Sequence, residues 1–223
     1  MENNETSLNN NSFYASVFRW LALGLAITFG AGYLLYYQFP EMLIKLMGGA
    51  YFVILIAELI LVIAFRVSIS KMNFTTSLIC YAPYSLLTGF TVAVLFAMFE
   101  GGSIISIFLV TAVVFALFGF IGSKLKMPLN KFGTFLIIGL IALVILELIN
   151  VFLLNNTLEI VLCVIGLVIF IGFIMFDFNR IQAYVDQGTG FDNTLALHFA
   201  FELYLDFINT FIKLLRLFGK RKD

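Results

Sequence analysis

Charged residues are scarce in this chain. Only 12% of its 223 residues are Asp, Glu, Lys or Arg, against about 25% in soluble domains. The 13 basic and 13 acidic side chains cancel, so there is no net positive charge to hold nucleic acid. With only three Pro and a hydrophobic share of 62%, a disordered or collagen-like chain is excluded. The composition predicts an integral membrane protein with one domain and no nucleic-acid partner.

Cysteine and histidine are also rare. Cys80 and Cys163 lie within apolar runs without a C-x-x-C partner, and His198 is the single histidine, so the residues of a zinc-type site are missing. The first dozen residues, MENNETSLNNNS, contain no Lys or Arg. Because a secretory signal needs a basic start and a short apolar core, we interpret the first apolar run as a retained span. No resident cofactor is predicted.

What the chain has instead is long apolar runs. A membrane-spanning helix needs about 20 mostly apolar residues, and seven runs meet this length. They are residues 20–39, 47–65, 78–99, 103–122, 133–154, 158–178 and 195–217. The sequence therefore predicts an all-α, seven-helix transmembrane domain over 20–217, between a polar tail (1–19) and a basic tail (218–223). The remaining loops are too short for a soluble catalytic domain, so we expect the function to reside in the bundle or at its rims.

The loops on the two sides of the membrane differ in basic residues. One side holds Arg19, Arg66, Lys71, Lys124, Lys126, Lys131 and Arg180, whereas the other holds only Lys45. By the positive-inside rule, the N-terminus is predicted to be cytoplasmic. Seven spans would put the C-terminus outside, yet the tail Lys220–Lys222 is basic and favours the cytoplasm. Either the last run crosses against the rule, or it re-enters the membrane and returns.

Five acids fall within or at the edges of the spans: Glu58, Glu147, Asp177, Glu202 and Asp206. Ionisable groups in a membrane cost free energy unless they are paired or hydrated, so they are the best indicators of function. Glu58 and Glu147 are single acids in their runs, and we interpret them first as hydrogen-bonded groups that face the bundle. Both remain candidates for a secondary polar pathway.

The last run carries six polar residues at intervals of three or four: His198, Glu202, Asp206, Asn209, Lys213 and Arg216. This spacing predicts one polar stripe along a helix. The stripe has two interpretations, an interfacial helix with its charged face in water or the lining of an internal polar pathway. Leu, Tyr and Phe surround the stripe almost completely, which favours the pathway, with Glu202 and Asn209 as secondary members.

Asp177 and Asp206 are the acids of greatest interest. Two carboxylates brought together in low dielectric cannot both ionise cheaply, so they form a proton switch. When ionised they suit calcium, but two carboxylates fall short of the 6–8 oxygens that calcium prefers, so weak, transient occupancy is expected. Contact between them requires the sixth helix to continue through residues 179–185. Arg66 shares the cytoplasmic depth of Asp177 and could pair with it or extend to the interface.

Four segments together resemble the transmembrane Bax inhibitor motif family, the Bax inhibitor-1-like proteins. They are YSLLTGFT (84–91), FGFIGSKLK (118–126), IMFDFNRI (174–181) and LYLDFINTFIKLLRLFG (203–219). The resemblance implies six helices around a central seventh, and a pH-sensitive calcium leak. It also implies a di-aspartyl sensor, here Asp177 and Asp206, and a latch arginine, for which Arg66 is the candidate. Glu202 fits an acid found one turn earlier in some relatives.

The resulting hypothesis is a pH-sensitive calcium leak channel and not an enzyme. Its partners would be the lipid bilayer, protons and calcium as the transported ion, with any protein partners unknown. The short tails resemble a bacterial plasma-membrane member, whereas a eukaryotic member would reside in the endoplasmic reticulum. Two alternatives remain: a non-conducting regulator of calcium homeostasis or cell death, and an intramembrane aspartyl protease, although the GxGD motif of those proteases is missing around Asp177 and Asp206.

Overall fold

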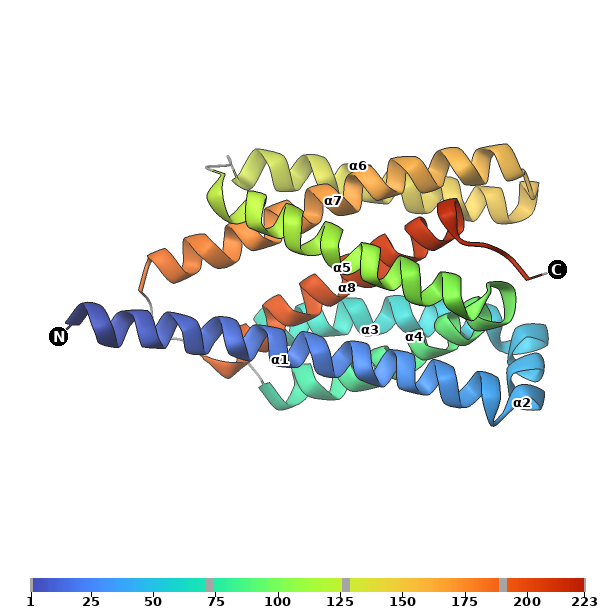
Figure 1. Ribbon diagram of the computed structural model, residues 1–223, viewed down its shortest axis with the longest axis horizontal. Helices are drawn as coiled ribbons and strands as arrows, with labels where there is room; N and C mark the ends of the chain where they lie inside the picture. Colours follow the sequence, from blue (N-terminus) through green and yellow to red (C-terminus); the bar gives the residue numbers. More distant parts are fainter. Residues whose placement is uncertain (1, 71–73, 126–128, 189–191, 223) are drawn as a thin grey trace. The chain divides into compact units, whose positions relative to one another are not determined.

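The computed structural model describes residues 2–70, 74–125, 129–188 and 192–222, and gives only the backbone for helix residues 2–10, 49, 51, 52, 55, 59, 63, 66–70, 129 and 130. The described residues are almost entirely helical (Figure 1). The helices are α1 (Glu2–Tyr37), α2 (Pro40–Lys45), the π-helical turn η1 (Leu46–Ala50), α3 (Tyr51–Ser70), α4 (Phe74–Met98), α5 (Gly101–Lys124), α6 (Leu129–Leu153), α7 (Asn156–Asp186) and α8 (Asn193–Phe218).

The predicted apolar runs match the long helices, one run to each, except that α2 and η1 were not expected. Among the described residues, six helices are long and apolar enough to cross a membrane: α1 from Asn11, and α4 to α8. The second predicted run corresponds to α3, a helix of 20 residues. The all-α membrane prediction is therefore confirmed, whereas the arrangement of six helices around a central seventh stays a prediction, as does the division into tails and a membrane domain.

The chain divides into two compact units. The first unit comprises Met1–Phe99, Gly190–Tyr204 and Arg221–Asp223, and the second comprises Glu100–Thr189 and Leu205–Lys220. The division falls inside α8, so the first half of this helix belongs to the first unit and the second half to the second unit.

In the first unit, α1 packs along α4 at very short range (Figure 1). Gly89 of α4 permits this approach, because a Cβ there would lie 2.7 Å from the Cβ of Ala31. Small residues let helix backbones approach closely in membranes, where the hydrophobic effect does not drive helices together. Aromatic side chains also pack in the interior of this unit, where the ring centroids of Phe65 and Phe201 are 4.0 Å apart.

In the second unit, α7 packs against both α5 and α6 (Figure 1). Gly122 of α5 lies against the backbone of α7, since a Cβ there would be 2.6 Å from the Cα of Met175. In α6, only 11% of the membrane-length window is buried within the protein. Its outward side chains, such as Phe135 at 72% and Phe152 at 81% exposed, are suited to lipid contact.

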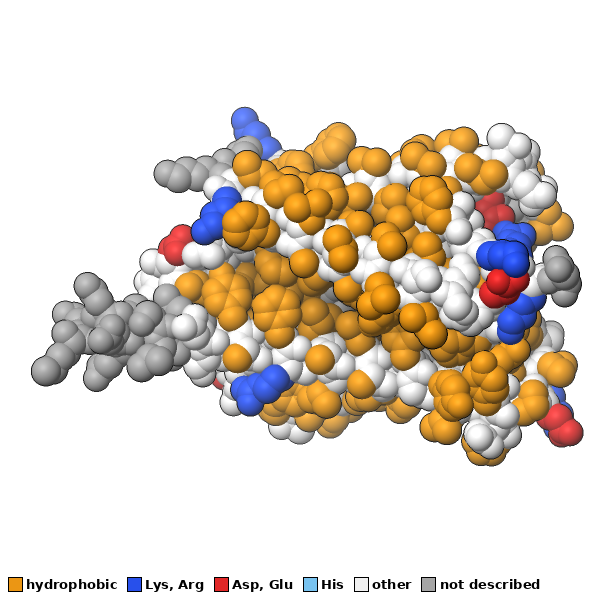
Figure 2. Space-filling view, in the orientation of Figure 1, with side chains coloured by type: hydrophobic (Ala, Val, Ile, Leu, Met, Phe, Trp, Pro, Cys, Tyr) orange, Lys and Arg blue, Asp and Glu red, His pale blue; other side chains and the backbone are white. Residues whose placement is uncertain are grey.

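The surface has the distribution expected of a membrane protein. Hydrophobic side chains cover most of the visible face, and charged side chains gather near the ends of helices (Figure 2). A soluble protein seldom exposes such contiguous apolar area. In a membrane this surface contacts lipid and needs no partner.

The basic tail packs against the segment that joins α4 to α5. In the second unit, the ammonium of Lys220 lies 2.7 Å from the Glu100 carboxylate. In the first unit, Arg221 forms an antiparallel bridge with Phe99, and the Lys222 ammonium donates a 2.8 Å hydrogen bond to the Tyr36 hydroxyl. The end of α8 therefore lies beside the α4–α5 connection. Helix α8 is one uninterrupted helix of 26 residues and is long and apolar enough to cross a membrane.

Candidate functional site

Asp177 and Asp206 are both buried in the second unit. Each residue is 4% exposed, Asp177 on α7 and Asp206 on α8. Helix α7 continues to Asp186, which meets the condition that the sequence set for contact between the two acids. A guanidinium nitrogen of Arg180, one turn further along α7, lies 3.3 Å from the Asp177 carboxylate. Arg180 thus places a positive charge beside Asp177 from the same helix.

Aromatic packing ties both aspartate-bearing segments to α5. Phe178 and Phe207 directly follow the two acids, and the ring centroid of Phe115 lies 5.4 Å from the first and 5.5 Å from the second. Since Phe115 contacts both neighbours, a rotation of α7 or α8 that moves either acid must disturb this packing. The position of each acid is coupled to α5 in this way.

The two asparagines that flank the acids contact backbone carbonyls. The Asn179 amide donates to the carbonyl of Gly122, at 2.9 Å, and to that of Leu125. It thereby adds a hydrogen-bond partner to carbonyls at the C-terminal end of α5, where the regular helical bonds run out. The Asn209 amide donates to the Leu205 carbonyl at 2.7 Å. Both contacts join an asparagine side chain to a backbone carbonyl and are structural.

The acid one turn before Asp206 lies in the first unit. Glu202 is 9% exposed, and its carboxylate oxygen is 3.5 Å from Nε2 of His198. The His198 ring stacks on Phe65 at a centroid distance of 6.4 Å. In α8, 67% of the membrane-length window is buried, which argues against the interfacial interpretation of the polar stripe.

The Glu147 carboxylate is hydrogen-bonded, as the sequence interpretation expected, and its partner is a charged base. It forms an ion pair with Lys213 of α8, and Lys213 is 5% exposed. Gly166 of α7 makes room for the lysine stem, since a Cβ there would lie 2.9 Å from the lysine Cε. Nearby, Arg216 lies 3.5 Å from Glu159. The sequence contained a partial indication of these pairs, because the opposite charges lie near corresponding ends of their apolar runs.

Glu58 lies in a half-buried position on α3 of the first unit. One buried carboxyl oxygen of Glu58 has no hydrogen-bond partner among the described residues, and the nearby Thr88 hydroxyl donates to the Tyr84 carbonyl at 3.0 Å. The interpretation of Glu58 as a hydrogen-bonded group stays a prediction. The side chain of Arg66, the candidate latch, lies outside the described residues.

A hydroxyl network in the first unit was missed by the sequence reasoning. The Thr28 hydroxyl of α1 donates to the Ser85 carbonyl at 2.9 Å and lies 2.6 Å from the Tyr204 hydroxyl. The Tyr81 hydroxyl donates to the Trp20 carbonyl at 2.9 Å. These uncharged groups link α1, α4 and α8, and only the polar face of α4 could have been noticed beforehand.

Within the ranges that the structure describes, no three His, Cys, Asp or Glu side chains gather as a metal site would require. Three acids of the second unit each have a base close by: Asp177 with Arg180, Glu147 with Lys213, and Glu159 with Arg216.

Residues 10–223 match the family model described as Bax1-I, inhibitor of apoptosis-promoting Bax1. The inner membrane protein YbhL of Escherichia coli is 30% identical over 216 residues, which are 95% of this chain and 92% of YbhL. A protein of Rickettsia prowazekii is 31% identical over 95% of this chain and 90% of its own length. A Streptococcus pyogenes membrane protein is 31% identical over 97% and 96%. This is not a known enzyme family. The chain is an integral, multi-pass membrane protein that belongs to the Bax inhibitor family.

Proposed function

We propose that this protein is a pH-sensitive calcium leak channel whose proton sensor is the pair Asp177 and Asp206. One observation carries the proposal: two acids, each 4% exposed, occupy membrane-length helices within the same compact unit. Buried acids in membrane helices are costly to keep, and they mark proton and ion pathways.

The chemistry follows from the low dielectric around the acids. When the two carboxyl groups share a proton, the pair carries one negative charge and its repulsion is small. Loss of that proton creates two like charges, which favours separation of the helices and attracts a divalent cation. Calcium would pass through weak contacts with these oxygens and would not be stored. The sensor therefore couples proton release to cation passage.

Two bases are candidates for holding the closed state. Arg180 lies 3.3 Å from Asp177 on the same helix, so it stabilises the ionised carboxylate without joining two helices. Arg66 on α3 is proposed as the interhelical latch, as the family resemblance implies. Glu202, Glu58, Asn209 and Glu147 are proposed as secondary members of the polar pathway. Glu147 also has a structural role, because its ion pair with Lys213 joins α6 to α8.

The test is calcium flux into liposomes that contain the purified protein, measured with an enclosed dye at acidic and at alkaline pH. We expect the wild type to pass calcium at a rate that changes with pH. Asp177→Asn and Asp206→Asn should each abolish the pH dependence, because an amide cannot exchange the proton. Asp186→Asn serves as the matched control, since Asp186 is an exposed acid at the end of the same helix α7.

Unchanged pH dependence in both variants would refute the sensor, and no flux from the wild type would refute the channel. The second outcome would favour a non-conducting regulator that acts through protein partners, a candidate supported by the family description as an inhibitor of apoptosis-promoting Bax1. Cleavage of a membrane-spanning reporter, lost in both Asn variants, would instead favour the intramembrane protease.

A further inference from the structure

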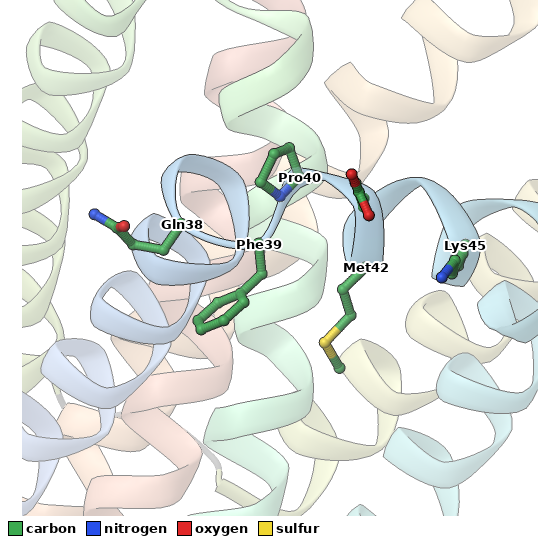
Figure 3. Close-up of a pocket in the computed structure, with 6 residues that line it drawn as sticks. Gln38, Phe39, Pro40, Met42 and Lys45 are labelled. Atoms are coloured by element: carbon green, nitrogen blue, oxygen red, sulfur yellow. The ribbon is translucent and has the colours of Figure 1, made fainter.

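A cavity of about 510 Å³ lies at the corner where the first unit turns from α1 into α2. It is lined by Gln38, Phe39, Pro40, Glu41, Met42 and Lys45 (Figure 3). Figure 3 shows the Phe39 and Met42 side chains extending to the same side of this corner. Pro40 begins α2, where its fixed φ and its missing N–H are tolerated. The chain thus makes a tight corner with a hollow that both polar and apolar side chains line.

The corner is anchored on one side and exposed on the other. Leu43 is 4% exposed and packs in a cluster with Ile54 and Phe90. By contrast, Phe39 is 57% and Met42 is 54% exposed. The corner therefore buries one apolar side chain and exposes two large ones. In a membrane protein, exposed apolar side chains of this kind contact lipid.

Tyrosines at the end of α1 indicate the depth of the corner in the membrane. Tyr33 and Tyr37 are 52% and 56% exposed, and Tyr36 and Tyr37 have ring centroids 4.7 Å apart. Tyrosines gather where lipid headgroups meet the hydrocarbon, because their rings are apolar and their hydroxyls are polar. These tyrosines indicate headgroup level for the cavity.

The cavity also carries one charge of each sign. Glu41 is in the first turn and Lys45 in the last turn of α2. Residues four apart lie on one face of a helix, with their Cβ atoms about 6 Å apart. Among the residues that the structure describes, neither takes part in an ion pair or a side-chain hydrogen bond. Both exposed charges are open to a ligand that has the opposite charges at a similar separation.

We propose that this corner binds a zwitterionic phospholipid with a primary amine, an ethanolamine phospholipid. The Lys45 ammonium donates to the lipid phosphate, and the Glu41 carboxylate accepts from the lipid ammonium. Phe39 and Met42 contact the first carbons of an acyl chain. An anionic headgroup would suffer repulsion from Glu41, and a choline headgroup has no N–H to donate to it. The paired charges therefore select both the phosphate and the amine.

The test measures lipid retention by the full-length protein in detergent, by native mass spectrometry with ethanolamine, choline and glycerol phospholipids of equal chain length. We expect the ethanolamine lipid to be retained about 2- to 5-fold better than the choline lipid, the range of an exposed charge pair. Glu41→Gln should abolish this preference, and Lys45→Gln should weaken retention of all three lipids. Soluble phosphoethanolamine should compete poorly, since it lacks the acyl chain.

The matched control neutralises another exposed acid and base, Glu100→Gln with Lys220→Gln, whose side chains already pair with each other at 2.7 Å. This control should retain lipid as the wild type does. The swap Glu41→Lys with Lys45→Glu keeps the net charge, so it separates the placement of the two charges from their sum. This variant should also lose the preference for the ethanolamine lipid. Equal retention of the three lipids by the wild type, or an unchanged preference in Glu41→Gln, would overturn the proposal. Tighter retention of the anionic lipid would do so as well.

Discussion

The two units of this protein keep polar groups in their interiors by different means. In the first unit, hydroxyl groups join the helices, as where Thr28 meets Tyr204 at 2.6 Å. In the second unit, full charges do so, as where Lys213 pairs with Glu147. Neutral hydrogen bonds contribute modestly between membrane helices, whereas unpaired charges are costly. The comparison shows helices joined by neutral hydroxyl groups at Thr28 in the first unit and by a charged pair at Lys213 in the second.

Helix α8 contributes to both kinds of interior. Its first half supplies Tyr204 to the hydroxyl network, and its second half supplies Asp206 and Lys213. A helix with this division joins the charged groups of the second unit to the hydroxyl network of the first through one continuous backbone. Removing one polar group at a time from each unit would distinguish the two kinds of interior.

The largest effect on stability is expected from Lys213→Met. It removes the partner of Glu147 and leaves an acid in a membrane helix, so we expect a loss of about 2–4 kcal/mol, below the value for a fully buried pair because the Glu147 side chain is 38% exposed. Thermal unfolding in detergent measures it. The double variant Lys213→Met with Glu147→Leu should recover most of the loss. Equal stability of the single and double variants would contradict a paired charge.

A smaller effect is expected from Thr28→Val in the first unit. The substitution keeps the shape and removes a hydroxyl that is 0% exposed, so the Tyr204 hydroxyl and the Ser85 carbonyl each lose a partner. We expect a loss of about 1–2 kcal/mol in the same unfolding measurement. Thr28→Ser retains the hydroxyl and should restore part of the stability. If Thr28→Val cost as much as Lys213→Met, the contrast between neutral and charged interiors would fail.

The sequence predicted the helices better than it predicted the contacts between them. The apolar runs were sufficient because a membrane demands about 20 apolar residues in each span, and Asp177 and Asp206 stood out as charges in such runs. The partner of Glu147 could not be chosen from the sequence, because periodicity gives the face of a helix but not its neighbour. Helix α2 was missed since six residues are too few to show a period.

The smallest effect is expected at the exposed end of the second unit. Arg216 and Glu159 are 3.5 Å apart, with side chains 41% and 32% exposed. Such a pair contributes about 0–1 kcal/mol and is screened by salt, so Arg216→Gln should lower stability slightly in dilute buffer and not at all in concentrated salt. Lys213→Met should keep most of its effect in salt, because a buried charge is screened much less. A loss that vanishes in salt for both variants would place Lys213 in water, and its pair with Glu147 could then no longer be contrasted with the hydroxyl network of the first unit.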